Sequence, residues 1–244
     1  MTTIFVAGAS GAVGRFLVPL LRAEGWRVVG LTRRPEKSGL LVSLGAEPLI
    51  ADVFDRETLL RSMEALRPQI VVHQLTDLPQ GLDPALMDRA AGLNARIRDE
   101  GTGNLVAAAL HCGADRLIAQ SVAFAYAAGP LPYSEKAPLA VEAEGRLGVS
   151  ARGVASLERQ VLAAPLTGLV LRYGKFYGPG TGFDRPPPSG PVHVEAAARA
   201  AALAITRGNP GIYNVAEDDG TVISEKAKQE LGWSADMRCP VQST

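Results

Sequence analysis

The chain has 244 residues, of which 47% are hydrophobic and 20% are charged, a balance typical of a globular protein with a sizeable core. Lysine plus arginine and aspartate plus glutamate both number 25, so the net charge gives no attraction to nucleic acid or to an anionic membrane surface. The composition argues against nucleic-acid and membrane partners and favours a small, roughly neutral molecule.

The cysteines and the N-terminus carry no sign of secretion or metal binding. Cys112 and Cys239 lie far apart and lack metal-ligand spacing, so we expect neither a disulfide framework nor a metal site. The start, MTTIFVAGAS, has no basic segment before its apolar run, and no stretch approaches the roughly 18 to 20 apolar residues of a membrane span. We therefore expect a cytoplasmic protein.

Short apolar runs alternate with stretches of helical periodicity through most of the chain. In order, the predicted elements are TIFVAG, a helix near 12–24, WRVVGLT, a short helix, EPLIADV, a helix near 55–65, QIVVHQL, a helix near 84–112, RLIAQSV, a helix near 149–163, and GLVLRYG. Such alternation indicates right-handed βαβ units, and continuously apolar strands are typical of a parallel sheet covered on both faces. The sequence predicts an α/β fold with a doubly wound parallel sheet, the Rossmann fold.

The pattern changes after Gly174, where YGPGTGFDRPPPSGP is rich in turn-forming residues. Its three consecutive prolines exclude a helix and favour an extended course. A helix near 193–207, a strand around GIYNV and a last helix near 224–231 follow. We therefore divide the chain into a first domain, 1–175, and a small C-terminal part, 176–244.

The first predicted strand leads into FVAGASGAVG, a glycine-rich loop that opens a helix. In this context glycines permit a tight turn, close approach of backbone N–H groups to a pyrophosphate, and close packing of the helix on the strand. The alternative is a strand-to-helix turn that is merely rich in glycine. We expect residues 1–175 to bind a dinucleotide, with contacts from Gly8, Ser10, Gly11, Ala12, Val13 and Gly14.

The second strand ends in GLTRRP, at the position that distinguishes the two nicotinamide dinucleotides. An acidic side chain there would accept a hydrogen bond from the ribose 2′-hydroxyl of NAD. Thr32, Arg33 and Arg34 instead offer donors and positive charge suited to a 2′-phosphate. Two arginines at a strand end can also be a solvated rim that binds no ligand. The residues predict NADP as the cofactor, in preference to NAD.

The third and fourth strands end in further candidate contacts. In ADVFD, Asp52 could hydrogen-bond the adenine or cap the following helix, while Val53 could pack on the adenine ring. VVHQLT places Leu75 and Thr76 at the carboxyl edge, where ligands bind in open α/β sheets.

The order of these motifs resembles the extended short-chain dehydrogenase/reductase superfamily, in its NAD-dependent epimerase/dehydratase branch. The matching segments are GASGAVG, VVHQLT, EGTGNLVAAALHCGADRLIAQS, LVLRYGKFYGPG, VHVEAAARA and GIYNV. They cover nearly the whole chain, so the resemblance implies both the fold and the cofactor type. It also implies that Tyr173 and Gly174 lie beside the nicotinamide and that Lys175 contacts the substrate. A homodimer through the helices near 84–112 and 149–163 is expected from the same resemblance.

The family's usual catalytic groups are a serine or threonine after the fifth strand and a Tyr-x-x-x-Lys pair on the next helix, whose lysine lowers the tyrosine pKa. Alignment of the helix on Glu158 puts Ser150 at the tyrosine position and Val154 at the lysine position. No tyrosine or lysine occurs between Ala137 and Tyr173, so no shift of register restores the pair. A serine hydroxyl is a poor acid near neutral pH, so we expect the tyrosine mechanism to be absent.

Other side chains remain as candidates for the chemistry. Alignment on Tyr126 puts Val122 at the serine or threonine position, with Ser121 one residue before it. We take Tyr126, Tyr173 and Ser121 as candidate catalytic residues, with Ser121 also near the cofactor. A tyrosine such as Tyr126, in the turn after a strand, can equally pack with its hydroxyl toward water. We expect His73 to be a core histidine and His193 to serve the turn before a helix.

Two functions follow from these residues. The first is an NADP-dependent oxidoreductase, or an isomerase or epimerase-like enzyme, of non-standard mechanism that acts on a small, largely apolar carbonyl or aromatic compound. The second is a catalytically silent NADP(H)-binding redox sensor or regulatory partner protein. We expect the substrate pocket between the sheet edge and the loop 176–192, with Lys175, Phe176, Phe183 and Ser150 as contacts.

Overall fold

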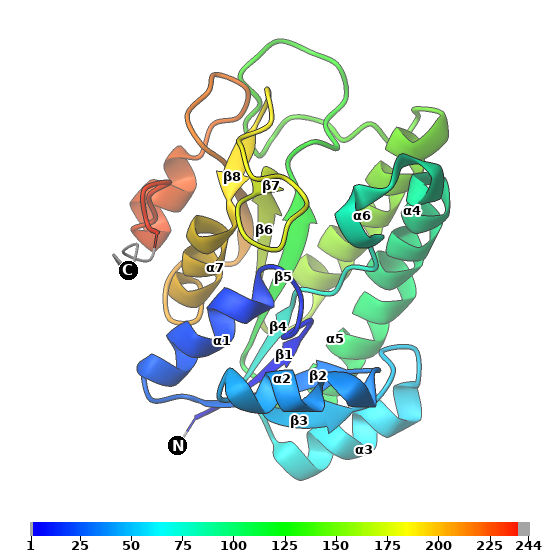
Figure 1. Cartoon of the computed structure of the whole chain (residues 1–244), viewed down its shortest axis with the longest axis vertical. Helices are drawn as coiled ribbons and strands as arrows, with labels where there is room; N and C mark the ends of the chain where they lie inside the picture. The colour runs from blue at the N-terminus through cyan, green and yellow to red at the C-terminus, as the bar shows by residue number, and fades with distance from the viewer. Residues whose placement is uncertain (1, 239–244) are drawn as a thin grey trace.

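The computed structural model describes residues 2–238, in which seven parallel strands form one sheet in the order β3-β2-β1-β4-β5-β6-β9 (Figure 1). The strands are β1 (Thr3–Ala7), β2 (Arg27–Thr32), β3 (Glu47–Ile50), β4 (Ile70–His73), β5 (Arg116–Val122), β6 (Thr167–Tyr173) and β9 (Gly211–Val215). Two short strands, β7 (Lys175–Tyr177) and β8 (Pro191–His193), pair with each other above the carboxyl edge. The predicted doubly wound parallel sheet is confirmed.

Helices cover both faces of this sheet (Figure 1). They are α1 (Gly14–Ala23), α2 (Ser38–Ser43), α3 (Arg56–Leu66), α4 (Met87–Arg96), α5 (Thr102–His111), α6 (Gly145–Ala163) and α7 (Val194–Leu203). A π-helical turn, Ile97–Gly101, joins α4 to α5, so the predicted helix near 84–112 is one nearly continuous element. None of the helices in the described part of the chain is long and apolar enough to span a membrane.

The strands are apolar without interruption because each face of the sheet packs into a hydrophobic core. In β1, Ile4 and Val6 pack into the core under α1 and α7, whereas Phe5 and Ala7 pack into the core under α3, α5 and α6. Successive side chains of a strand point to opposite faces, so a strand buried on both faces has to be apolar at every position. Burial of all five β1 residues agrees with this.

The strand order reverses between β1 and β4, because the chain builds outward from β1 to β2 and β3 and then returns to its other side. Ligands in open α/β sheets bind at the carboxyl ends of the strands that flank such a reversal. The glycine loop after β1 and the segment after β4 therefore meet at the expected crevice.

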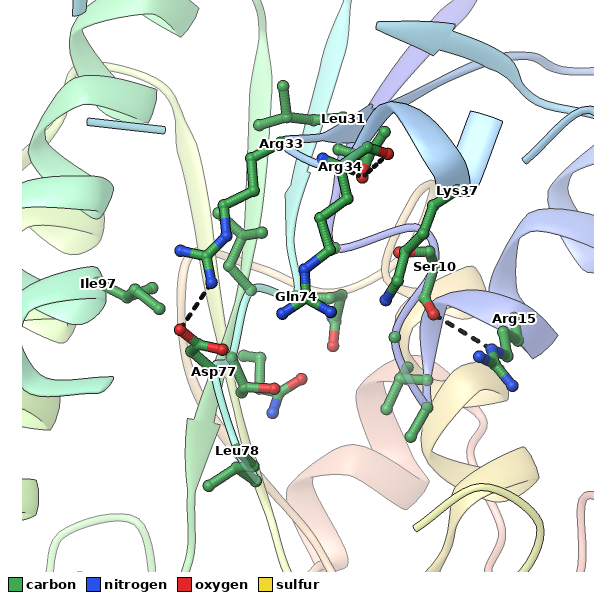
Figure 2. Close-up of a pocket in the computed structure, with 18 of the residues that line it drawn as sticks. Ser10, Arg15, Leu31, Arg33, Arg34, Lys37, Gln74, Asp77, Leu78 and Ile97 are labelled. Atoms are coloured by element: carbon green, nitrogen blue, oxygen red, sulfur yellow. Dashed lines mark hydrogen bonds and ion pairs between the residues drawn. The ribbon is translucent and has the colours of Figure 1, made fainter. Parts of the chain in front are cut away.

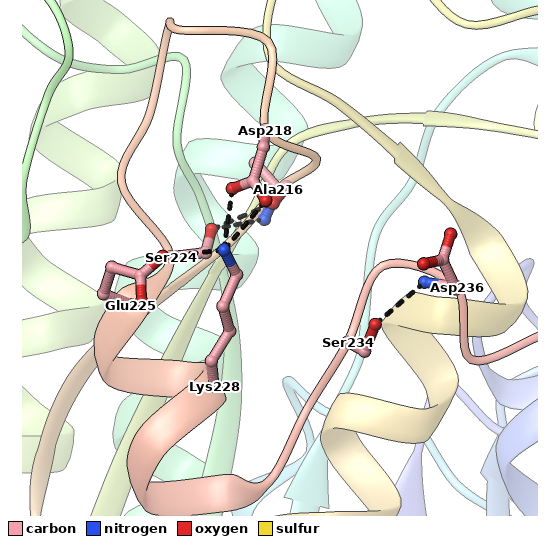
Figure 3. Close-up of polar contacts among 7 residues, drawn as sticks. All are labelled: Ala216, Asp218, Ser224, Glu225, Lys228, Ser234 and Asp236. Carbon is pink, nitrogen blue, oxygen red and sulfur yellow. Dashed lines mark hydrogen bonds and ion pairs between the residues drawn. The ribbon is translucent and has the colours of Figure 1, made fainter.

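The chain beyond residue 175 contributes both to the main sheet and to the segments that lie above its carboxyl edge. β9 pairs with β6, and α7 packs beside α1. The last helical turn is Ala227–Leu231, and two residues fix the loop between it and β9. Ser224 Oγ hydrogen-bonds both the N–H and the C=O of Ala216 at 3.0 Å, and Lys228 pairs with Asp218 and Glu225 (Figure 3). The division at residue 175 stays a prediction, and Cys239 lies outside the described residues.

Candidate cofactor and active site

A cavity of about 380 Å³ lies along the carboxyl ends of β1 to β4. Most of the residues expected to bind the cofactor line it, namely Gly8, Ser10, Gly11, Ala12, Val13, Thr32, Arg33, Arg34, Asp52, Val53, Leu75 and Thr76. Phe176, expected to contact substrate, lines it as well. Gly14, Ser121, Tyr173 and Gly174 are buried and are not among the residues that line this cavity.

The glycine loop is shaped by close backbone contacts that no side chain would permit. Gly8 adopts φ +93°, and a Cβ there would lie 2.4 Å from the carbonyl oxygen of Gln74 on the neighbouring strand segment. A Cβ on Gly14 would lie 2.3 Å from the Gly8 carbonyl oxygen. These glycines let α1 begin directly beneath the loop, so its N-terminus faces the cavity and favours an anion there. The loop fits the pyrophosphate of a dinucleotide.

Four cationic side chains gather where β2 ends, at one end of the cavity. Arg33 Nη2 pairs with Asp77 Oδ2 at 2.8 Å, while Arg34 and Lys37 extend toward the glycine loop near Arg15 (Figure 2). Burial, followed by the positive charges of Arg34 and Arg15, lowers the pKa of Lys37. Like charges held this close repel one another, and a bound anion would offset that repulsion.

Some polar side chains after β2 and β3 hydrogen-bond the local backbone, and some also line the cavity. Thr32 Oγ1 accepts a hydrogen bond from the N–H of Arg34, which fixes the turn leading to Lys37. Asp55, and not Asp52, caps α3 by accepting from the N–H of Thr58 at 3.0 Å. Asp52 accepts from the N–H of Phe54 and lines the cavity, so the helix-cap alternative for Asp52 is excluded.

Gln74 brings an unsatisfied acceptor to the cavity wall. Its Nε2 lies 3.5 Å from the hydroxyl of Tyr173, and its Oε1 is buried without a hydrogen-bond partner among the described residues. Buried acceptors of this kind are normally paired. A donor on a bound molecule would satisfy it.

The two positions that we align with the family's catalytic pair, Ser150 and Val154, lie on α6. Val154 is fully buried in a small apolar cluster, and Ser150 Oγ accepts a hydrogen bond from Arg98 Nη1 at 2.8 Å. Burial lowers the pKa of Arg98 to about 10, which leaves its guanidinium charged at neutral pH. The cation beside position 150 thus comes from the π-helical turn before α5.

Tyr126 and Ser121 belong to a buried polar network between α6 and β6. Glu158 and Arg172 pair through both carboxylate oxygens at 2.6 and 2.7 Å. Ser121 Oγ donates to Glu158 at 2.8 Å, and the Tyr126 hydroxyl donates to Asn214 and accepts from Arg172. Burial raises the pKa of Tyr126. Burial likewise raises the pKa of Tyr173, whose side chain is fully buried.

A second, smaller cavity lies beyond β7. It contains Lys175, whose Nζ donates to Ser189 Oγ at 2.7 Å, together with the ring of Tyr126. Phe183, expected in the wall of the substrate pocket, is 48% exposed and lines neither cavity.

Several residues of the site were not predicted from the sequence. Lys37 follows Arg34 at helical spacing in RRPEK, a signal that could have been used. Arg15, Gln74, Asp77 and Arg98 carry no local motif, because their positions depend on how distant segments pack.

The fold and this crevice define a Rossmann-type dinucleotide-binding protein. Residues 4–191 match the NAD dependent epimerase/dehydratase family, and the chain belongs to that family. The chain is also 41% identical to the 3-diazoavenalumate denitrifying reductase of a Streptomyces species, over 88% of this chain and 76% of that protein.

Solved structures agree in fold. The UDP-glucose 4-epimerase of Thermotoga maritima with UDP-glucose superimposes with a TM-score of 0.76 at 19% identity, over 96% of this chain and 93% of that one. The UDP-glucose 4-epimerase of Thermus thermophilus, in complex with NAD, gives a TM-score of 0.72 at 21% identity, over 96% and 84% of the two chains. The family membership expected from the motifs is confirmed.

Proposed function

We propose that this protein is an NADPH-dependent reductase that removes a diazonium group from an aromatic substrate. The observation that carries the proposal is an intact dinucleotide crevice in a chain that has Ser150 and Val154 where we align the family's tyrosine and lysine. The 41% identity to a reductase named for denitrifying a diazo compound supports it.

The cofactor would be held by residues at the ends of four strands. The glycine loop and the start of α1 would take the pyrophosphate. Arg34, Lys37 and Arg15 would take the 2′-phosphate, since these cations have no carboxylate partner among the ion pairs of residues 2–238. Asp52 and Val53 would contact the adenine, and Gln74 Oε1 would accept a hydrogen bond from the bound molecules.

The chemistry suits a site without an acid. The chemistry that NADPH would supply when bound is a hydride, which would replace dinitrogen at the ring carbon of an arenediazonium ion and leave the arene, N₂ and NADP⁺. This reaction consumes no proton, so no side chain has to donate one. Reduction of a ketone needs a proton on the product oxygen, and burial raises the pKa of both tyrosines nearest the sheet edge, Tyr126 and Tyr173.

A turnover assay tests this function. Purified protein with NADPH and 4-carboxybenzenediazonium should release N₂ and consume NADPH in equal amounts, with benzoate as the product. The controls are the same mixture without protein and with Gly11→Val, whose Cβ would lie 3.2 Å from the Gly8 carbonyl oxygen in the glycine loop that lines the cavity. NADPH binding with no turnover would contradict the proposal and favour a redox sensor, and interconversion of UDP-sugars would favour an epimerase.

We also propose a homodimer built on α4 and α6. The two helices pack side by side, and they leave Leu93 and Leu147 37% and 43% exposed. Exposed apolar side chains on adjacent helices suit a helix-bundle interface. Sedimentation velocity should give a dimer for the natural chain and a monomer for Leu147→Asp, and a monomeric natural chain would contradict the assembly.

A further inference from the structure

The second cavity carries features that define a ligand class. It measures about 200 Å³. Consecutive side chains of a strand point to opposite sides, so two neighbouring residues of β7 line the two cavities. Phe176 lines the first cavity and Lys175 the second. A ligand in the second cavity would therefore lie on the other side of β7 from the first cavity.

Aromatic faces form much of its wall. The rings of Tyr126 and Tyr133 stack with centroids 4.9 Å apart, and Phe124 is 46% exposed beside them. Both tyrosine hydroxyls are engaged in the protein, Tyr126 with Asn214 and Arg172 and Tyr133 with the backbone of Gly129. These tyrosines therefore offer ring surface more than hydrogen bonds.

The size of the cavity limits the occupant to one substituted ring. A protein cavity of about 150 Å³ accommodates benzene, so about 200 Å³ leaves room for a ring with a short substituent. A nucleotide sugar would extend well beyond this volume.

One cation faces this apolar space. Lys175 Nζ donates to the Ser189 hydroxyl, and no ion pair of residues 2–238 includes Lys175. The nearby acid Asp219 is occupied by the N–H groups of Gly190 and Thr221 and by the Thr221 hydroxyl. An ammonium without an acidic partner, next to a hydroxyl donor, is suited to a carboxylate.

The cavity is built before any ligand arrives. The N–H of Tyr133 donates to the Thr221 carbonyl and the N–H of Ile223 donates to the Tyr133 carbonyl, both at 2.9 Å. The loop that carries Thr221 and Val222 is fixed in turn by the contacts of Ser224 and Lys228 (Figure 3). Preformed walls lower the ordering cost of binding.

From these observations the geometry points to a binding site for an aromatic carboxylate, with the ring against Phe124 and Tyr133 and the carboxylate on Lys175 and Ser189. This inference rests on the proposed function for the reaction, and it adds a substrate class for the cavity on the other side of β7. The binding itself needs neither a diazonium group nor turnover.

Calorimetry with cinnamate and its neutral amide tests the site on the full chain without NADPH. Cinnamate should bind at least about tenfold more tightly than cinnamamide, the ratio expected for one charge-assisted contact. Lys175→Met should remove that difference and leave cinnamamide binding unchanged. The matched control, Lys136→Met, changes an exposed lysine of the neighbouring loop that does not line the cavity, and it should behave as the natural chain.

Equal affinity for the two ligands, no binding of either at millimolar concentration, or unchanged cinnamate binding by Lys175→Met would overturn the inference. Val222→Trp, which fills the cavity, should abolish binding of both ligands while the circular dichroism spectrum stays native. Cinnamate binding without any diazonium turnover would refute only the proposed reaction, whereas turnover that Lys175→Met leaves unaffected would refute only the carboxylate site.

Discussion

At the scale of single residues, we propose that cations without acidic partners make the protein prefer NADPH to NADH. Arg34 points toward the glycine loop, whereas Arg33 is already paired with Asp77 (Figure 2). Arg34→Ala should weaken NADPH binding by about 1.5–3 kcal/mol and leave NADH nearly unchanged, since only NADPH carries the 2′-phosphate. Fluorescence titration of both cofactors measures this, with the exposed Arg56→Ala on α3 as the control. Equal losses for the two cofactors would refute the assignment.

Ser150 stands at the position that we align with the family's catalytic tyrosine. Its hydroxyl accepts from Arg98, so Ser150→Ala removes one hydrogen bond. We expect turnover to fall by no more than about tenfold. A loss of about a thousandfold, with folding and NADPH binding intact, would show that the serine performs acid–base catalysis.

His73 makes the stability of the fold depend on pH. Its Nδ1 accepts from the N–H of Leu75, so its Nε2 carries the proton that faces Thr102. Burial, with a further contribution from the charge of Arg98, lowers the pKa of His73 to about 4. The unfolded chain has a histidine pKa near 6.5, so it takes up a proton between about pH 6.5 and 4 that the folded protein does not. Stability is retained above this range and is lost as the pH falls through it.

Urea unfolding at pH 7 and pH 4.5 measures this contribution. Between pH 7 and pH 4.5 the free energy of unfolding should fall in both proteins. The fall should be about 2 kcal/mol smaller in His73→Gln than in the natural chain. Parallel pH dependences in the two proteins would show that His73 is not the group responsible.

At the scale of elements, α6 is held to β6 by the ion pair of Glu158 and Arg172, which are 5% and 3% exposed. Glu158→Gln leaves a buried guanidinium without its counter-charge and should cost about 3–5 kcal/mol of stability. Glu100→Gln, which breaks an exposed pair with Arg96, should leave the stability almost unchanged, because solvent screens exposed ion pairs. Denaturant titration of both variants tests the contrast, and equal costs would contradict the role given to the buried pair.

The elements themselves were largely predictable from sequence, because strand apolarity and the glycine turn are local properties. The structure starts α6 at Gly145, four residues before the predicted start near 149, and the early turn has no side-chain cap that a sequence could reveal. The approach of Arg98 to Ser150 and the pairing of Arg33 with Asp77 join segments 52 and 44 residues apart. Such contacts depend on tertiary packing, so local periodicity does not encode them.

At the scale of the whole molecule, the family's cofactor crevice is combined with a helix that has no proton donor. In the proposed function the sheet order, the glycine loop and the cations would hold the cofactor, while the second cavity would take a small aromatic ligand. A reaction that needs hydride and no proton reconciles these two features.

Isotope transfer tests this account most directly. With NADPH deuterated at C4 and 4-carboxybenzenediazonium in ordinary water, the benzoate product should carry one deuterium at the carbon that lost nitrogen. The same reaction with unlabelled NADPH in D₂O should place no deuterium at that carbon. Deuterium from solvent at that position, or none from the cofactor, would contradict direct hydride replacement of dinitrogen.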